Sequence, residues 1–417
     1  MKAMQNRERE SAGQYQGAAK REGWNWKPLG EVCKTGSGGT PLSSRKEYYE
    51  GGNIPWLLSG EVAQGNVRGA KNFITKAGME NSAAKLFPRD TVLVAMYGAT
   101  AGQVGILRFE AATNQAVCGI LPNEKLVPEF LFYFLLAKKD ELVAQATGNA
   151  QPNISQIKIK NTEIPVPPLA EQQRIVGLLD EAFECIATAK ANAEKNLQNA
   201  RALFESHLQS VFTQRGPGWL AKRLEDIADA DCSLSYGIVQ PGEEFDEGMP
   251  IVRPTDLTSK VIRLTGLKRI DPKLAEGYKR TTLQGGELLL CVRGSTGVIS
   301  IASTELVGAN VTRGIVPIRF NRSLLLSEFG FHLLSGGPVQ RQIREKTYGT
   351  ALMQINIRDL RLISLSIPPL NEQRAIAAKL DSLYEETQRL ARLYERKCAA
   401  LEALKRSLLH QAFSGEL

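Results

Sequence analysis

Two long segments of the chain carry apolar residues in alternating steps of four and three, the heptad spacing of helices that pack against other helices. The first segment runs from Ala170 to Phe212 and the second from Asn371 to Phe413, and neither contains a proline. Pro168 and Pro369 stand just before them, as expected where a strand ends and a helix starts. At 1.5 Å per residue, each predicted helix would extend roughly 65 Å.

The seams of the two predicted helices match when the first is shifted by 201 residues. The two seams are Ile175, Leu179, Ala182, Ile186, Ala189, Ala193, Asn196, Ala200, Leu203 and His207, and Ile376, Leu380, Leu383, Thr387, Leu390, Tyr394, Lys397, Leu401, Leu404 and Leu408. One interpretation is a coiled coil with a partner chain or an ordinary bundle. We favour the other, in which the two helices pair antiparallel with each other. Centred seams would then place Asn196 level with Thr387.

Shorter apolar patterns indicate mixed globular domains. The runs TVLVAM (91–96) and ELLLCV (287–292) are bounded by turn residues, as buried strands are. Residues 128–146 have helical spacing and open with proline, which is favoured in a first turn. Their counterpart, 327–346, is interrupted at 336–338 by Gly-Gly-Pro, so we expect a break there. The predicted fold class is α+β.

The chain contains an internal repeat of two copies. PPLAEQQRI (167–175) matches PPLNEQRAI (368–376), RDTVLVAMYGATAG (89–102) resembles GELLLCVRGSTG (286–297), TNQAVCGI (113–120) resembles ANVTRGI (309–315), and WKPLGEV (26–32) resembles WLAKRLEDI (219–227). Each copy therefore contains a domain followed by a long helix. The predicted boundaries are a polar, flexible leader at 1–25, domains at 26–168 and 219–369, helices at 169–213 and 370–413, and a tail at 414–417.

Charge and candidate chemistry narrow the function. The net charge is +8, and each predicted domain has three more Lys and Arg residues than Asp and Glu, which favours a polyanionic partner. The six cysteines form no CxxC pair and only three histidines occur, so neither a metal site nor a disulfide framework is suggested. No phosphate-binding P-loop is present, and the Gly-rich GSGG, GATAG and GSTG segments read as turns. With no apolar run as long as a membrane span and no signal peptide, we expect a cytoplasmic protein.

The two PPLxEQ helix starts, the GATAG and GSTG turns after apolar strands, and the final AFSGEL (412–417) resemble the specificity (S) subunit of type I restriction–modification enzymes. The resemblance covers Trp26 to Leu417. It implies that each domain reads one half of a split site on double-stranded DNA, and that the helices fix the spacing between half-sites and dock two modification subunits. Those subunits would bind S-adenosylmethionine and methylate adenine, and restriction subunits would use ATP and Mg²⁺. The S subunit itself would do no chemistry and hold no cofactor or metal.

Polar and aromatic residues near turns and strand ends are the candidate DNA contacts. In the first domain they are Lys34, Ser37, Arg45, Lys46, Tyr97, Asn114, Gln151 and Asn153, and in the second Tyr236, Arg253, Arg293, Arg313, Lys346 and Tyr348. Arg293 and Arg313 are preferred, because each lies beside a strand–turn junction matched in the other copy. For the others, a solvated surface role is the simpler interpretation. Asn114 and Asn310 coincide in the repeat and are interpreted as a shared structural turn.

The residues that begin the long helices are candidates for partner binding: Glu171, Gln172, Arg174, Glu372, Gln373 and Arg374. Capping is the simpler interpretation, since acidic residues suit the positive end of a helix dipole. Two other functions stay open at this point. One is a self-contained DNA-modifying enzyme, which would need a cofactor loop that the sequence does not display. The other is a protein-binding scaffold.

Overall fold

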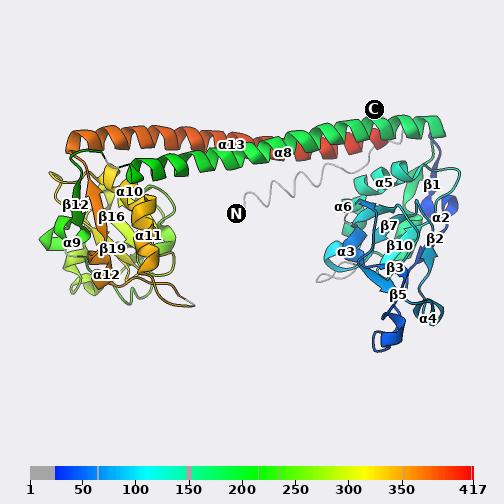
Figure 1. Cartoon of the computed structure of the whole chain (residues 1–417), viewed down its shortest axis with the longest axis horizontal. Coiled ribbons are helices and arrows are strands. Elements are labelled where there is room, and N and C mark those ends of the chain that lie inside the picture. The colour runs from blue at the N-terminus through cyan, green and yellow to red at the C-terminus, as the bar shows by residue number, and fades with distance from the viewer. Residues whose placement is uncertain are drawn as a thin grey trace. The chain divides into compact units, whose positions relative to one another are not determined.

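A computed structural model of the chain describes residues 24–62, 65–146, 153–214, 216–232, 234–350, 352–414 and 416–417. They fall into two compact units, each with one globular domain and one stretch of each long helix (Figure 1). Unit 1 is Met1–Ala193 with Arg396–Leu417, and unit 2 is Glu194–Glu395. Nearly all of the predicted leader lies outside the described residues.

The domain of unit 1 (domain 1) contains two main sheets, with strand orders β2-β10-β7-β8-β4 and β5-β3-β9-β6, and a two-stranded pair, β1-β11. The strands are β1 (Trp26–Pro28), β2 (Thr35–Ser37), β3 (Ile54–Leu57), β4 (Asn66–Val67), β5 (Asn72–Ile74), β6 (Leu86–Phe87), β7 (Val92–Ala95), β8 (Val104–Leu107), β9 (Ala111–Thr113), β10 (Val117–Ile120) and β11 (Glu163–Pro165). The strand predicted at 91–96 is β7. It is buried along its whole length and pairs antiparallel with β8 and β10.

The domain of unit 2 (domain 2) repeats this plan with the sheets β14-β17-β16-β19 and β15-β13-β18 and the pair β12-β20. Its strands are β12 (Leu220–Arg223), β13 (Met249–Val252), β14 (Val261–Ile262), β15 (Lys268–Ile270), β16 (Leu288–Cys291), β17 (Ile299–Ala302), β18 (Asn310–Val311), β19 (Ile315–Ile318) and β20 (Ser364–Ile367). The buried strand predicted at 287–292 is β16, which pairs antiparallel with β17 and β19 as β7 pairs with β8 and β10.

Short helices connect the strands. They are α2 (Leu29–Val32), α3 (Ser59–Val62), α4 (Lys76–Glu80), α5 (Pro128–Ala137), α6 (Lys139–Ala144) and α7 (Gln156–Asn161) in domain 1, and α9 (Leu224–Ile227), α10 (Ser327–Ser335), α11 (Gly337–Glu345) and α12 (Ile357–Arg361) in domain 2. Of these, α3, α5 and α10 pack against the sheets. The predicted break at 336–338 is confirmed, because α10 ends before Gly336 and α11 starts after it. The helix predicted at 128–146 also divides, into α5 and α6.

The two long helices, α8 (Leu169–Thr213) and α13 (Leu370–Ser414), have 45 residues each and run antiparallel within each unit. In unit 1, Lys190 pairs with Glu402, and the Lys405 ammonium lies 4.9 Å from the centre of the Phe183 ring. In unit 2, Arg201 pairs with Glu395 at 2.8 Å. Positions that rise along α8 therefore meet positions that fall along α13, as the seams predicted.

The buried face of α8 follows the predicted seam only in part. Its buried seam residues are Ile175, Leu179, Ile186, Ala193 and Ala200, whereas Asn196 and Leu203 are exposed and the face continues at Leu208 and Phe212. A straight helix turns once in 3.6 residues, so a strict 3.5-residue seam drifts by about 20° per heptad. The register predicted from centred seams is wrong, since Asn196 is exposed while Thr387 is buried beside Tyr384, which contacts Phe204.

Aromatic contacts join each domain to its stretch of the helix pair. In unit 1, the Phe413 ring of α13 lies 5.3 Å from the rings of Phe130 and Phe134 on α5. In unit 2, Phe212 of α8 lies 5.7 Å from Phe329 on α10. Tilted and edge-on ring pairs of this kind stabilise by about 0.5–1.5 kcal/mol beyond the area they bury. The helices therefore form part of each domain's core.

All six cysteines are free thiols, and four of them are buried. Burial raises the pKa of Cys118 to about 12, which suppresses its reactive thiolate form. Among the described residues, no helix is both long and apolar enough to cross a membrane.

Candidate nucleic-acid interface

Backbone hydrogen bonds bring several candidate residues of domain 1 together at one end of the sheet β2-β10-β7-β8-β4. Gly39 N–H donates to Thr113 O at 2.9 Å, and Met96 N–H donates to Ala116 O at 2.8 Å. Tyr97 and Asn153 form an antiparallel bridge. We call this group turn cluster 1 and define it as Ser37–Gly39, Leu58, Tyr97, Asn114–Ala116 and Asn153.

Domain 2 builds the same group with the same bonds. Ile238 N–H donates to Val311 O at 2.8 Å, and Val292 N–H donates to Gly314 O at 2.8 Å. Arg293 and Gln354 form an antiparallel bridge. Turn cluster 2 is defined as Tyr236–Ile238, Arg253, Arg293, Thr312–Gly314 and Gln354.

The matching bonds pair the side chains of the two clusters position by position. Asn114 N–H donates to Leu57 O at 2.9 Å, and Thr312 N–H donates to Val252 O at 3.0 Å. The equivalent positions are Ser37 and Tyr236, Leu58 and Arg253, Tyr97 and Arg293, Asn114 and Thr312, Gln115 and Arg313, and Asn153 and Gln354. One backbone scaffold therefore carries two different sets of side chains.

This pairing corrects the predicted equivalence of Asn114 and Asn310. Asn310 lies in β18 opposite Ile251, the position that Ala112 occupies opposite Trp56 in domain 1. Asn310 is fully buried and bonded, accepting from Thr281 Oγ1 at 2.7 Å and donating to Tyr278 O at 3.1 Å, so its role is structural. Asn114 is half-buried, and its enclosed Oδ1 has no hydrogen-bond partner among the residues that the structure describes.

Three arginines of turn cluster 2 stand in different environments. Arg253 donates from Nη2 and Nε to the Asp256 carboxylate at 2.9 and 3.1 Å, and these hydrogen bonds raise its pKa. Arg293 is half-buried, and its enclosed Nε has no hydrogen-bond partner in the described part of the chain. Arg313 is exposed and takes part in none of the ion pairs among the described residues. An exposed guanidinium can form a bidentate contact with a phosphate or a base edge.

Some predicted contacts lie outside the clusters. Lys34 stands at the opposite end of β2, where its carbonyl accepts from Leu121 N–H. Arg45 and Lys46 pair with the nearby Glu47 and Glu50. Lys346 follows α11 and precedes Tyr348, which is 48% exposed and bridges to Gln354, so this pair borders turn cluster 2. Gln151 lies outside the described residues.

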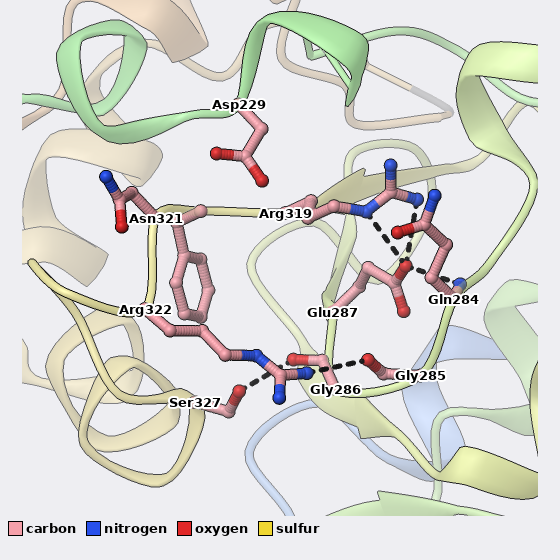
Figure 2. Close-up of a pocket in the computed structure, with 10 residues that line it drawn as sticks. Asp229, Gln284, Gly285, Gly286, Glu287, Arg319, Asn321, Arg322 and Ser327 are labelled. Atoms are coloured by element: carbon pink, nitrogen blue, oxygen red, sulfur yellow. Dashed lines mark hydrogen bonds and ion pairs between the residues drawn. The ribbon is translucent and has the colours of Figure 1, made fainter.

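A pocket of about 350 Å³ lies at the other end of β16, before the strand begins (Figure 2). Arg319 donates from Nη2 to Glu287 Oε1 at 3.0 Å, and Glu287 is almost completely buried. Arg322 donates to Gly285 O at 3.3 Å, and Ser327 donates to Gly286 O at 2.7 Å. These bonds tie the turn before β16 to the segment after β19, so the pocket belongs to the scaffold of domain 2.

Two glutamines fasten the long helices to the domains in the same way. Gln172 accepts from Val127 N–H at 2.8 Å and donates to Lys125 O and Pro167 O at 2.8 and 2.9 Å. Gln373 makes the same bonds with Leu326, Leu324 and Pro368. Both side chains are fully buried, which corrects the prediction that they bind a partner: their amides are used inside the chain. We call Gln172 and Gln373 the glutamine latches.

The other predicted docking residues lie closer to solvent. Arg174 donates to both carboxylate oxygens of Glu171, at 2.8 and 2.9 Å, and to Leu417 O at 3.1 Å. Glu372 accepts from Trp219 Nε1 at 2.8 Å. Arg374 is exposed. Glu171 and Glu372 therefore have partners within the chain, and Arg174 and Arg374 present charge at the surface.

An aspartate on each long helix makes a second contact with its domain. Asp180 accepts a hydrogen bond from Tyr133 on α5. Asp381 is 2.6 Å from His332 Nε2 on α10 and also pairs with Lys260. Burial raises the pKa of Tyr133 and lowers that of His332. Burial alone would raise the pKa of Asp381, but bonds from Lys260 and His332 hold it below its usual value.

This doubled architecture matches a known family. The family model described as the type I restriction modification DNA specificity domain matches residues 21–198 and again residues 217–395. The chain belongs to this family.

Specificity subunits from two organisms are similar in sequence to this chain. The specificity subunit of the type I restriction enzyme EcoBI from Escherichia coli is 24% identical over 74% of this chain and 69% of its own length. The EcoR124I/EcoR124II specificity subunit from Escherichia coli is 29% identical over 45% of this chain and 48% of its own length. The MjaIX specificity subunit from Methanocaldococcus jannaschii is 25% identical over 94% of this chain and 93% of its own length.

Solved structures share the specificity-subunit fold. A chain from a study of complex assembly and conformational transition in the type I R-M system aligns with a TM-score of 0.77 at 22% identity, covering 96% of this chain and all of its own. The HsdS subunit from Thermoanaerobacter tengcongensis aligns with a TM-score of 0.62 at 22% identity, covering 98% of this chain and all of its own. The likeness supports the predicted α+β class with two mixed domains and two long helices.

In this member of the specificity family, the sequence prediction missed several residues of the clusters, and two of them carry side-chain amides. Gln115 is the counterpart of Arg313, and Gln354 is the counterpart of Asn153. The similarity of β10 and β19 could have revealed the equivalence of Gln115 and Arg313. The sequence match of 113–120 with 309–315, however, paired Ile120 with Ile315. The structure pairs Ile120 with Ile318 instead. A three-residue error in the alignment therefore hid Gln115.

Proposed function

We propose that this chain is the DNA-reading subunit of a type I restriction–modification complex, in which turn cluster 1 contacts one half of a bipartite site and turn cluster 2 the other. The observation that carries the proposal is the doubled turn cluster: equivalent hydrogen bonds hold equivalent backbone positions, while the side chains on them differ. Two domains with the same backbone scaffold but different side chains suit two half-sites of different sequence.

Charge and side-chain chemistry support DNA as the ligand. Each domain carries three more basic than acidic residues, and neutralising phosphates is the main sequence-independent source of DNA affinity. Sequence is read by hydrogen bonds to base edges, for which Arg, Asn and Gln are the most suitable side chains. The clusters present all three types, together with exposed Tyr97 and Tyr236.

The long helices suit two further roles in the proposed complex. Half-sites on a duplex must be met at a fixed spacing, which a pair of packed helices can set. Modification subunits would dock on the helices, with Arg174 and Arg374 as exposed contacts at the helix starts. S-adenosylmethionine would bind to those modification subunits, and ATP and Mg²⁺ to restriction subunits, while this chain itself would do no chemistry.

Selection of bound duplexes from random DNA tests the proposal directly. The full chain is incubated with its modification subunits, and bound duplexes are sequenced. We expect two short enriched motifs separated by a fixed unspecified spacer. No enriched bipartite motif would contradict the DNA-reading function and favour a protein-binding scaffold. Saturable S-adenosylmethionine binding by the purified chain alone would instead favour a self-contained modifying enzyme.

The helices' proposed role in spacing has its own test. Insertion of seven residues into the middle of α8 extends that helix by about 10 Å. The same selection should then return both half-site motifs with a changed spacer. Unchanged motifs at an unchanged spacing would remove the spacing role while leaving DNA reading intact.

A further inference from the structure

We propose that Gln115 and Arg313 are the paired base-reading residues of this chain, Gln115 reading an adenine in the half-site of domain 1 and Arg313 a guanine in the half-site of domain 2. The assignment rests on the proposed DNA-reading function and names one specificity-determining residue in each domain, with the base that each takes.

The backbone places these two residues at the same point of the scaffold. On one side, Asn114 N–H bonds to Leu57 O as Thr312 N–H bonds to Val252 O. On the other side, Ala116 O accepts from Met96 N–H as Gly314 O accepts from Val292 N–H. Both residues therefore stand in the middle of a turn whose two ends are fixed. Each side chain leaves its domain from an equivalent position.

Exposure singles out this pair from the other paired positions of the clusters. Gln115 and Arg313 are both exposed. Among the other positions, Arg253 is engaged by Asp256, and Leu58 is apolar. Asn114 and Thr312 are half-buried, as are Ser37 and Gln354, so no other pair is exposed in both domains. Tyr97 is exposed, but its counterpart Arg293 has its Nε enclosed. Within the described residues, the Gln115–Arg313 pair thus presents a hydrogen-bonding end group from both domains.

Each side chain has two free hydrogen-bonding positions for a bidentate contact. The Thr40 hydroxyl donates to Gln115 Oε1, which orients the amide and leaves a second acceptor position on Oε1 and the two hydrogens of Nε2. Arg313 has the five donors of its planar fork and no ion pair among the described residues.

The end groups then determine the bases. An adenine offers an acceptor at N7 and a donor at N6 in the major groove, which match the donor and acceptor of a glutamine amide. A guanine offers acceptors at N7 and O6, which match two donors of a guanidinium. Loss of one such contact reduces discrimination against the wrong base by about 5- to 150-fold.

Reciprocal substitution tests the assignment. R313Q and Q115R are each made in the full chain, incubated with the modification subunits and taken through the duplex selection. For R313Q, we expect the preference for guanine at one position of the domain 2 half-site to fall by about 5- to 150-fold, with the other half-site unchanged. For Q115R, we expect the same loss for adenine in the domain 1 half-site.

Arg263 provides a matched control. It is 73% exposed and follows β14, at the end of the sheet opposite to turn cluster 2, so R263Q makes the same chemical change away from it. R263Q should return the wild-type motif. The assignment is overturned if R313Q and Q115R also return it, or if R313Q alters both half-sites. Absence of a bipartite motif with the wild-type chain would instead defeat the proposed function, so the two failures are distinguishable. Either variant alone decides the matter if the other fails to fold.

Discussion

Turn clusters 1 and 2 have equivalent backbone hydrogen bonds but differ in the charge of their side chains. At three paired positions, domain 1 has Leu58, Tyr97 and Gln115, all uncharged, and domain 2 has arginine. The bonds that hold each turn come from main-chain groups, so the side chains can change without loss of the scaffold. The scaffold of this fold is therefore separable from the side chains that it presents, which are the ones we propose to read DNA. Features of one domain can be transplanted or removed, with the other domain as reference.

The largest expected effect concerns the buried ion pair of Glu287 and Arg319, which domain 1 replaces with Thr91 and Leu121. R319L leaves the buried Glu287 carboxylate without a counter-ion, with only the Gln284 N–H among the described residues donating to it, and should lower the free energy of unfolding of unit 2 by about 3–5 kcal/mol. The double variant E287T/R319L restores the domain 1 combination and should recover most of that loss. Hydrogen exchange of peptides from β16, with β7 as internal reference, measures both. Equal losses in the single and double variants would contradict the prediction.

The glutamine latches should respond alike in the two units. Q172A and Q373A each leave a backbone N–H and two carbonyls unpaired in a buried site, which should cost about 2–3 kcal/mol in the unit concerned. Urea denaturation, monitored by hydrogen exchange of peptides from α5 in unit 1 and α10 in unit 2, measures the loss of stability in each unit separately. The neighbouring, exposed Gln173 is the control, and Q173A should change stability by less than about 0.5 kcal/mol. A latch variant as mild as the control would show that the amide bonds contribute little.

Arg293 tests whether the clusters act separately. R293Y installs the residue of domain 1, Tyr97, at the equivalent position. Arg293 lies in the same cluster as Arg313, but its Nε is enclosed. We therefore expect discrimination in the domain 2 half-site to weaken by only about 1 kcal/mol, with the domain 1 half-site unchanged. Competition binding with duplexes mutated in one half-site at a time gives both values. Weakened discrimination in both half-sites would contradict reading domain by domain.

The smallest effect is a pH dependence confined to unit 2. Burial lowers the pKa of His332, so the folded state binds fewer protons there than the unfolded state, and stability falls as the pH drops through the unfolded value near 6.5. Lys260, which faces the same site, also disfavours the charged ring, while Asp381 favours it. H332Y installs the tyrosine that domain 1 uses at Tyr133 and should remove the dependence. Urea midpoints at pH 7.5 and 5.5 provide the measurement, and an equal pH dependence in H332Y would exclude His332 as its source.

Periodicity made much of this fold predictable. The buried strands β7 and β16, the long helices and the break at 336–338 all follow from local patterns of apolar residues, Gly and Pro. Equivalence within the clusters was harder to predict, because the offset between the copies is 201 residues at the long helices but 198 at β10 and β19. A sequence comparison has no means to place such gaps inside a short turn.

The glutamine latches show a second limit of sequence reasoning. Polar residues in a first helical turn are typical of an exposed surface, and the sequence does not reveal that Gln172 and Gln373 are covered by the segments preceding α5 and α10. The buried face of α8 follows the predicted seam only in part for a related reason. A heptad pattern defines a face over a few turns, but a straight helix rotates that face over 45 residues.

The division into units has a consequence for synthesis of the chain. Unit 2 is one continuous stretch, Glu194–Glu395, whereas unit 1 needs Arg396–Leu417, which leave the ribosome after all of unit 2. Until then, Phe130 and Phe134 lack the ring of Phe413. Part of the apolar core of nascent domain 1 therefore stays uncovered while some 200 further residues are translated. At roughly 5–20 residues per second, this takes about 10–40 s. A chaperone that shields α5 during that interval would be expected to raise the yield of the folded protein, although domain 1 is made first.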